Sequence, residues 1–226
     1  MRNLMGWTKT RGRAKGFTLI ELMVTVAILT VVVGVVVDGL TRLMQRNKME
    51  ESKVDLTQES REFMDQIVND IHQSGYPSLK MFDPATLASA TNCTLDTNVS
   101  CGLVNVTPSS LQFEADVDGT GVVQEVYIQL SPLNGPCPCT IQRGTVAKAA
   151  GPGAVPAYYT EVTGVNNTNI FQGYDNGGNN VPLAGAPTNN LAALEMTLSV
   201  RATVPDANGF YPIINMSTSA KIHNFN

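Results

Sequence analysis

The run KGFTLIE at residues 15–21 opens the stretch of this chain that decides its fold. From Phe17 to Val37 the sequence carries a single charged side chain, Glu21. A helix needs about 20 predominantly apolar residues to cross a bilayer. A carboxylate near the bilayer centre costs roughly 2.5–3.5 kcal/mol on insertion scales. The pattern therefore predicts a membrane-length helix in which Glu21 requires a partner.

The residues before Phe17 form a short basic leader. It has no acidic side chain and five positive ones, at Arg2, Lys9, Arg11, Arg13 and Lys15. A basic segment beside an apolar span stays in the cytoplasm, so we expect residues 1–16 there and the rest of the chain outside. Loss of the leader would change the formal net charge from −4 to −9. That balance disfavours nucleic acid as a partner.

Two ordinary targeting signals are the alternatives for this N-terminus. A secretory signal peptide has an apolar region of about 7–15 residues that ends at an A-x-A-like site. Here the apolar region continues to Val37 and is followed by Asp38 and Gly39. A plain signal anchor would account for the length and the orientation, but it gives no reason for Glu21.

The order of a basic leader, Gly16, Phe17, Thr18, Leu19 and Glu21 resembles the type IV prepilin signature. The resemblance implies that prepilin peptidase cuts after Gly16 and methylates the new N-terminal amine of Phe17. It also implies that Glu21 meets the terminal amine of a neighbouring subunit. The implied partners are prepilin peptidase, other major and minor pilins, and the inner-membrane assembly platform.

A second periodicity extends the apolar span into one long helix, from Phe17 to about Ser74, without any proline. Apolar residues share one face of its second half, at Phe63, Met64, Ile67, Val68 and Ile71. Charged residues, Glu59 among them, are expected on the opposite, solvent face. Gly75 and Pro77 supply the stop signal.

Beyond the helix the sequence predicts β-structure with long loops. A hairpin is expected from two strands, Leu111–Ala115 and Val122–Leu130, joined by a turn at Asp118-Gly119. A third strand is expected at Ala192–Val204, where apolar and polar residues alternate, and a weaker final strand at Ile213–Ile222. Residues 147–156 and 166–190 are rich in Gly, Pro and Asn, so they are expected to be loops. We expect an α+β, pilin-like fold in which the helix, from about Met49 to Ile71, covers a small antiparallel sheet.

These patterns divide the chain into four expected parts. They are a cytoplasmic leader at 1–16, a transmembrane and assembly helix at 17–38, an amphipathic continuation at 39–75, and a β-rich extracytoplasmic head at 76–226. The expected location is the bacterial inner membrane, as a single-pass precursor, and then a pilus or pseudopilus.

All four cysteines lie in the expected head, outside the cytoplasm, where disulfides persist. Three connectivities are possible. Cys93 and Cys101 are favoured as a local pair. Cys137 and Cys139 are separated only by Pro138 and would close a very tight ring, so we expect them to reach other partners. Their spacing is not that of a familiar zinc finger.

The sequence offers no catalytic constellation. Asp116–Gly121 faintly resembles a calcium loop, but Thr120 occupies the third acidic position and a plain turn is the better interpretation. His72 and His223 lack nearby catalytic partners. No phosphate-binding glycine loop, hydrolase elbow or metalloprotease motif occurs. We therefore expect a protein that is not an enzyme and that needs neither a cofactor nor a metal.

Three segments after the apolar stretch favour minor subunits over major ones within the pilin resemblance. The helix end Asn69–Tyr76, the strand Leu194–Val204 and the segment Ala220–Asn224 are similar to PilW-like minor pilins and J-type pseudopilins. A minor type IV pilin that enters or primes a filament is the first expectation. A type II secretion pseudopilin is its rival. A signal-anchored binding or adhesion module is the alternative of another class, in which Glu21 would be dispensable and the leader would stay attached.

The leader is expected to be removed between Gly16 and Phe17 in the native host. The reason is the basic leader followed by the order Gly-Phe-Thr-Leu-Ile-Glu at residues 16–21. Intact-mass measurement of assembled or surface material should match a chain that starts at Phe17. Protein that still carries residues 1–16 would contradict the prediction.

Overall fold

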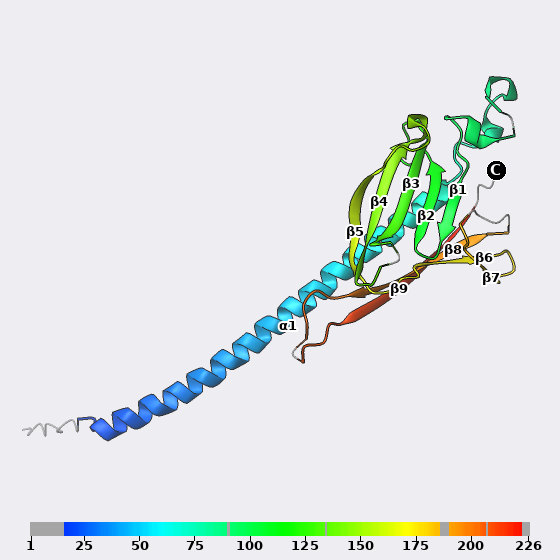
Figure 1. Cartoon of the computed structure of the whole chain (residues 1–226). Helices are drawn as coiled ribbons and strands as arrows, with labels where there is room; N and C mark the ends of the chain where they lie inside the picture. Colours follow the sequence, from blue (N-terminus) through cyan, green and yellow to red (C-terminus); the bar gives the residue numbers. More distant parts are fainter. Residues whose placement is uncertain (1–15, 90, 134, 186–189, 207, 223–226) are drawn as a thin grey trace, which may run out of the picture. The chain divides into compact units, whose positions relative to one another are not determined.

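The computed structural model describes residues 16–89, 91–133, 135–185, 190–206 and 208–222 (Figure 1). The chain divides into two compact units, Met1–Gln45 and Arg46–Asn226. Residues 1–15 of the expected leader and His223 lie outside the described residues. The two units are described in turn.

Helix α1 spans Leu19–Gln73, which confirms the long proline-free helix. Every described residue of the first unit is exposed. Among the described residues, α1 is the one helix that is long and apolar enough to cross a membrane, by length and composition, and none of its most apolar window is buried. An all-round apolar surface of this kind must be covered by lipid or by protein.

In the second unit, α1 buries one stripe of residues three or four positions apart. The stripe consists of Leu56, Ser60, Phe63, Met64, Ile67, Asp70 and Ile71. This spacing places the side chains on one helical face, and the predicted apolar face is confirmed. Glu59 was expected on the solvent face, and that expectation was wrong. It is half-buried, because its carboxylate accepts the backbone N–H of Thr163 at 3.1 Å.

Within the described residues, nine strands form one antiparallel sheet. They are β1 (Leu103–Thr107), β2 (Ser110–Ala115), β3 (Gln124–Ser131), β4 (Cys139–Ala147), β5 (Ala157–Val165), β6 (Phe171–Tyr174), β7 (Asn180–Val181), β8 (Ala193–Arg201) and β9 (Ile213–Lys221). Their order is β1-β2-β3-β4-β5-β8-β6-β7, and β9 pairs with β8. Short 3-10 turns at Leu79–Met81, Pro84–Thr86 and Cys93–Leu95 separate α1 from β1, and a fourth, Lys148–Ala150, follows β4.

The sheet bends sharply where β5 meets β8. These two strands share one paired position, Val165 opposite Val200. Figure 1 shows β1–β5 as one curved part, and β8, β9, β6 and β7 as a second part that crosses it. Gly164 permits the junction, because its φ is +70° and an added Cβ would lie 2.7 Å from the carbonyl oxygen of Arg201.

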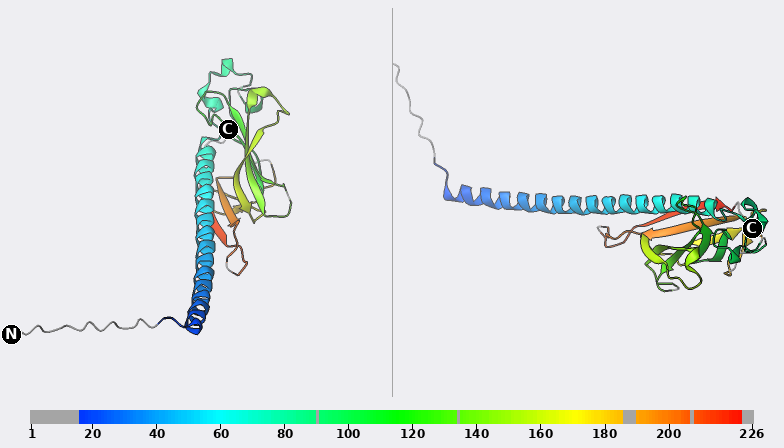
Figure 2. Two further views of the ribbon diagram at one scale, coloured as in Figure 1. Left: turned by 90° about the vertical axis from the view of Figure 1, so that its left-hand side faces the viewer. Right: turned by 90° about the horizontal axis from the view of Figure 1, so that it is seen from above.

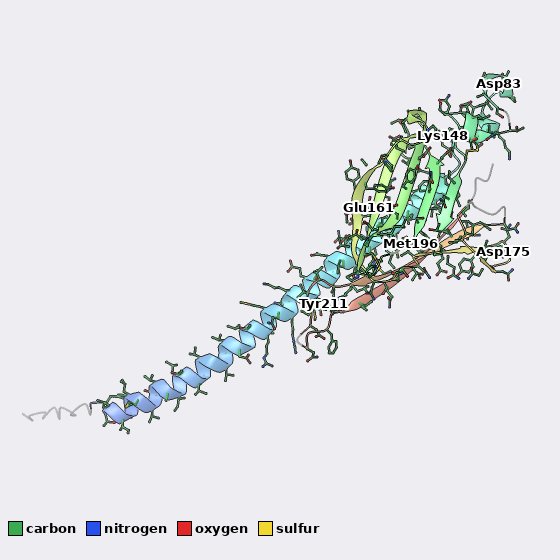
Figure 3. The ribbon with its side chains drawn as sticks, in the orientation of Figure 1. Asp83, Lys148, Glu161, Asp175, Met196 and Tyr211 are labelled. Atoms are coloured by element: carbon green, nitrogen blue, oxygen red, sulfur yellow. A yellow bond between two sulfur atoms is a disulfide. The ribbon has the colours of Figure 1, made fainter. Side chains whose placement is uncertain are left out.

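The buried stripe of α1 and the inner face of the sheet form one core. Phe113, Ile128 and Ile141 each expose 1% of their surface or less, and Met196 from β8 joins them. Figure 2 shows the second half of α1 running along one face of the strands. Met196 is labelled among the crowded side chains of the crossing strands in Figure 3.

A buried ion pair also joins α1 to the sheet. Nε and Nη2 of Arg143, on β4, donate to one carboxylate oxygen of Asp70 at 3.2 and 2.9 Å. Burial raises the pKa of Asp70, and the Arg143 charge opposes that rise. Burial likewise raises the pKa of Glu59, against the hydrogen bond from Thr163. These acids on the buried side of α1 break the simple division into an apolar and a charged face.

Four strand predictions are confirmed and others were missed. β2 and β3 form the expected hairpin, and β8 and β9 fall inside the two predicted C-terminal segments. The expectation of a loop over 166–190 was wrong in part, because β6 and β7 lie within it. β1, β4 and β5 were not predicted. In β4 the inward-facing Arg143 interrupts the apolar alternation, and the pairing with β5 changes register twice.

Ser60→Ala is expected to stabilise the head. Ser60 is fully buried, and its hydroxyl has no hydrogen-bond partner among the described residues. An unpaired buried hydroxyl carries a desolvation cost of about 1 kcal/mol or more. The free energy of unfolding, measured in urea on the full-length chain in detergent, should rise by about 1 kcal/mol.

Ser52→Ala is the matched control on the same helix. The Ser52 hydroxyl lies 3.0 Å from that of Thr203, so its removal breaks a formed hydrogen bond. The control should leave stability unchanged or slightly lower. A loss of stability in Ser60→Ala equal to or greater than that of the control would refute the assignment of an unpaired hydroxyl.

Candidate functional site

The start of α1 positions the residues that the sequence singles out. Thr18 is the N-cap, since its carbonyl accepts the N–H groups of Glu21 and Leu22 at 3.1 and 3.2 Å. Its hydroxyl also accepts the Glu21 N–H, at 3.4 Å. Glu21 therefore occupies the third helical position, where the helix dipole favours a negative charge. The sequence reasoning missed this role of Thr18, although S/T-x-x-E is the spacing of a capping box.

The bond expected to be cut lies in exposed, non-helical backbone. Gly16 and Phe17 precede the helix, and the Phe17 side chain is 73% exposed. No atom lies within 4 Å of the position that a Cβ on Gly16 would occupy. A protease therefore meets no folded obstacle at this junction within the described residues.

Glu21 is the polar group of the apolar stretch whose side chain has no partner among the described residues. The hydroxyls of Thr25 and Thr30 donate to the carbonyls of Leu22 and Val26, each at 2.8 Å. These internal bonds remove most of the cost of a hydroxyl in an apolar medium. The carboxylate of Glu21, by contrast, has no hydrogen bond or ion pair with any described residue.

The next acidic residue on the helix differs in this respect. Asp38 forms an ion pair with Arg42, four residues later, at 3.0 Å, and both side chains are more than 60% exposed. Such a pair contributes at most about 0.5 kcal/mol. The carboxylate of Asp38, which follows the apolar stretch, therefore already has a partner within this helix.

The structure joins the cysteines in two local pairs. Cys93 is bonded to Cys101, with Cα atoms 5.3 Å apart. Cys137 is bonded to Cys139, with Cα atoms 4.5 Å apart, near the short end of the range for disulfides. The expectation that these last two reach other partners was therefore wrong. Each of the four cysteines has its partner within the same short segment, and none is free.

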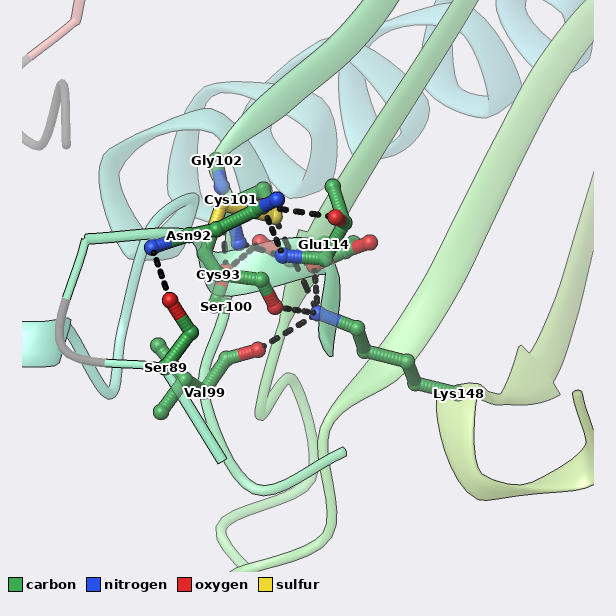
Figure 4. The surroundings of a disulfide bond; sticks show 10 residues. Ser89, Asn92, Cys93, Val99, Ser100, Cys101, Gly102, Glu114 and Lys148 are labelled. Carbon is green, nitrogen blue, oxygen red and sulfur yellow. Dashed lines mark hydrogen bonds and ion pairs between the residues drawn. A yellow bond between two sulfur atoms is a disulfide. The ribbon is translucent and has the colours of Figure 1, made fainter. Parts of the chain in front are cut away.

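A buried charge lies beside the Cys93–Cys101 bond. The ammonium group of Lys148 contacts a carboxylate oxygen of Glu114 at 2.7 Å, and both side chains are 7% exposed. It also donates to the carbonyl oxygens of Cys93 and Val99, at 2.8 and 2.7 Å (Figure 4). Neither Lys148 nor Glu114 was singled out from the sequence, because 34 residues separate them.

The remaining candidates form no reactive group. Asp116 and Asp118 accept hydrogen bonds from their own turn, chiefly from Thr120, and these bonds lower the pKa of the exposed Asp118. In the described residues no three His, Cys, Asp or Glu side chains are grouped to hold a metal. His72 lies in the last turn of α1, and His223 falls outside the described part.

Comparison with known proteins identifies the N-terminal segment. Residues 11–37 match the model of the prokaryotic N-terminal methylation motif. No curated protein and no solved structure gave a significant match to the chain. The matched span includes Gly16, Phe17 and Glu21, and it ends where the apolar stretch ends.

Thiol chemistry provides a check on the two cysteine pairs. Denatured, unreduced protein from an exporting host should contain no free thiol, because both pairs are oxidised. Peptide mapping should find Cys93 linked to Cys101 and Cys137 linked to Cys139. A peptide in which Cys137 is linked to Cys93 or Cys101 would contradict the structure.

Proposed function

We propose that this chain, which carries the N-terminal methylation motif of type IV pilin and pseudopilin precursors, is a minor type IV pilin. In this proposal prepilin peptidase cuts between Gly16 and Phe17 and methylates the Phe17 amine. The processed subunit then leaves the inner membrane and enters, or primes, a filament. Proteins with this motif are structural rather than catalytic, so the expected function of this protein is to assemble with other subunits.

The observation that carries the proposal is the carboxylate of Glu21, which has no partner among the described residues and lies on an exposed apolar helix. An uncompensated charge in a low-dielectric environment is costly, and an opposite charge in hydrogen-bond geometry offsets that cost. Cleavage after Gly16 would create a cation one residue before the helix cap. In a bundle of such helices, the new amine of one subunit is the natural partner for Glu21 of the next.

The helix itself favours a minor subunit. Major pilins usually have a proline inside the exposed part of the first helix. Here α1 is unbroken from Leu19 to Gln73. The head is also large, since nine strands follow the helix within the described residues.

The same features suit a J-type pseudopilin of a type II secretion system, which is the second candidate. The segment Asn69–Tyr76, which covers the end of α1 and the three residues after it, is similar to both groups. Deletion of the gene in its host separates them. Loss of surface filaments with normal secretion favours the pilin, whereas loss of secretion with normal filaments favours the pseudopilin.

Glu21→Ala should block assembly while sparing insertion. The span becomes more apolar, so insertion is no worse, and the residues at the cut are unchanged. In the bundle, however, the unpaired amine would cost about 3–5 kcal/mol. Because each factor of ten corresponds to about 1.4 kcal/mol, the ratio of this protein in sheared filaments to that in membranes should fall about a hundredfold or more.

Asp38→Ala is the matched control, because it removes a carboxylate from the same helix that already has a partner in Arg42. It should leave the filament-to-membrane ratio within about twofold of wild type. Equal ratios in Glu21→Ala and wild type would sink the assembly role of Glu21. The signal-anchored module would then be the better account.

A further inference from the structure

The buried cluster around Lys148 has no part in the proposed assembly chemistry. Lys148 follows β4, and its side chain reaches beneath the segment that connects α1 to β1. Figure 3 places Lys148 at the end of the sheet from which the segment containing Asp83 extends. We refer to residues 79–102 as the distal segment.

The three donors of the Lys148 ammonium have three strong acceptors. One is the Glu114 carboxylate at 2.7 Å, and the other two are the carbonyl oxygens of Cys93 and Val99. A buried ammonium is tolerated only when such partners satisfy it. Only one of the three partners, Glu114, belongs to the sheet, and the other two belong to the distal segment.

Both carbonyls lie in the ring that the Cys93–Cys101 disulfide closes. The sulfur of Cys101 is itself 3.8 Å from the ammonium nitrogen of Lys148. A ring of nine residues has few conformations compared with an open chain. The disulfide therefore holds the two carbonyls at the separation that one ammonium group can bridge.

Glu114 secures the same ring from the other side. The carboxylate oxygen that faces Lys148 also accepts the backbone N–H of Cys101, at 2.8 Å. The backbone carbonyl of Glu114 accepts the hydroxyl of Ser100, and its N–H donates to the carbonyl of Gly102 at 2.8 Å. The ring is thus fastened to β2 by backbone bonds and to Lys148 by charge.

We propose that formation of the Cys93–Cys101 disulfide and formation of the Lys148 contacts are coupled. The distal segment then docks on the sheet only when the two cysteines are oxidised. Disulfides persist outside the cytoplasm, so the disulfide would form, and the distal segment would dock, after the head has crossed the membrane. This timing rests on the proposed export, whereas the coupling itself does not. A dithiol reduces the Cys93–Cys101 bond by exchange, in which the protein gains two thiols and the dithiol becomes a disulfide.

The competing explanation is that the disulfide and Lys148 stabilise the head independently. The disulfide would then act only by restricting the unfolded chain. Hydrogen exchange of the distal segment distinguishes the two, because independent contributions to local opening multiply and coupled ones do not.

The experiment follows amide exchange by mass spectrometry on the full-length chain in detergent micelles. The variants are Lys148→Met, the double serine variant of Cys93 and Cys101, and their combination. Each change alone should speed exchange in the distal segment by about tenfold or more, and the combination should add less than about threefold to the faster one. A combined effect equal to the product of the two would overturn the proposal.

Two further measurements keep the result interpretable. The double serine variant of Cys137 and Cys139 is the control, and it should leave exchange in the distal segment unchanged with or without Lys148→Met. If Lys148→Met fails to fold, Lys148→Met combined with Glu114→Gln replaces it, because that variant leaves no unpaired buried charge. Dithiol-treated wild-type protein whose distal segment exchanges no faster than untreated protein would also overturn the proposal.

Discussion

The head depends on the packing of one stripe of α1 against the inner face of the sheet. Phe63 and Ile67 belong to the stripe, and they share one cluster of buried residues with strands of both parts of the sheet. Burial of such apolar side chains contributes about 1.5–3 kcal/mol each. No other described helix of more than three residues covers the strands. The sheet therefore owes its dry inner face to this stripe.

Two kinds of polar group accompany that apolar contact and serve different ends. Asp70 with Arg143 is satisfied inside the fold, so it fixes the position of the helix on β4. Glu21 has no partner among the described residues, and in the proposed filament the terminal amine of a neighbouring subunit would supply one. The first pair thus contributes to the tertiary structure of the head, whereas the exposed Glu21 contributes to the proposed contact between subunits.

The sequence predicted the parts of the fold in which one periodicity persists. The alternation of Leu194, Met196, Leu198 and Val200 predicted β8, because only one face of that strand is buried. β4 escaped prediction because Arg143 points inward and draws its partner from a helix 73 residues earlier. Glu21 was found because the order of its neighbours is informative. The Lys148 cluster was not, since its contacts join positions 34 to 55 residues apart.

The narrow junction between the two parts of the sheet bears on how the head responds to force. The ladder between β5 and β8 consists of Val165 opposite Val200. Other backbone bonds also join the two parts: the N–H of Asn166 donates to the carbonyl of Ser199 at 2.7 Å, and Val106 and Gly185 form an isolated bridge. A load that separates β5 from β8 would break fewer paired strand positions than one that separates β8 from β9, where nine positions are paired. Resistance to separation of the two parts comes from these backbone bonds together with the side chains of the shared core. The two parts of the sheet are therefore held together at several separate points rather than along one continuous ladder of strand pairs.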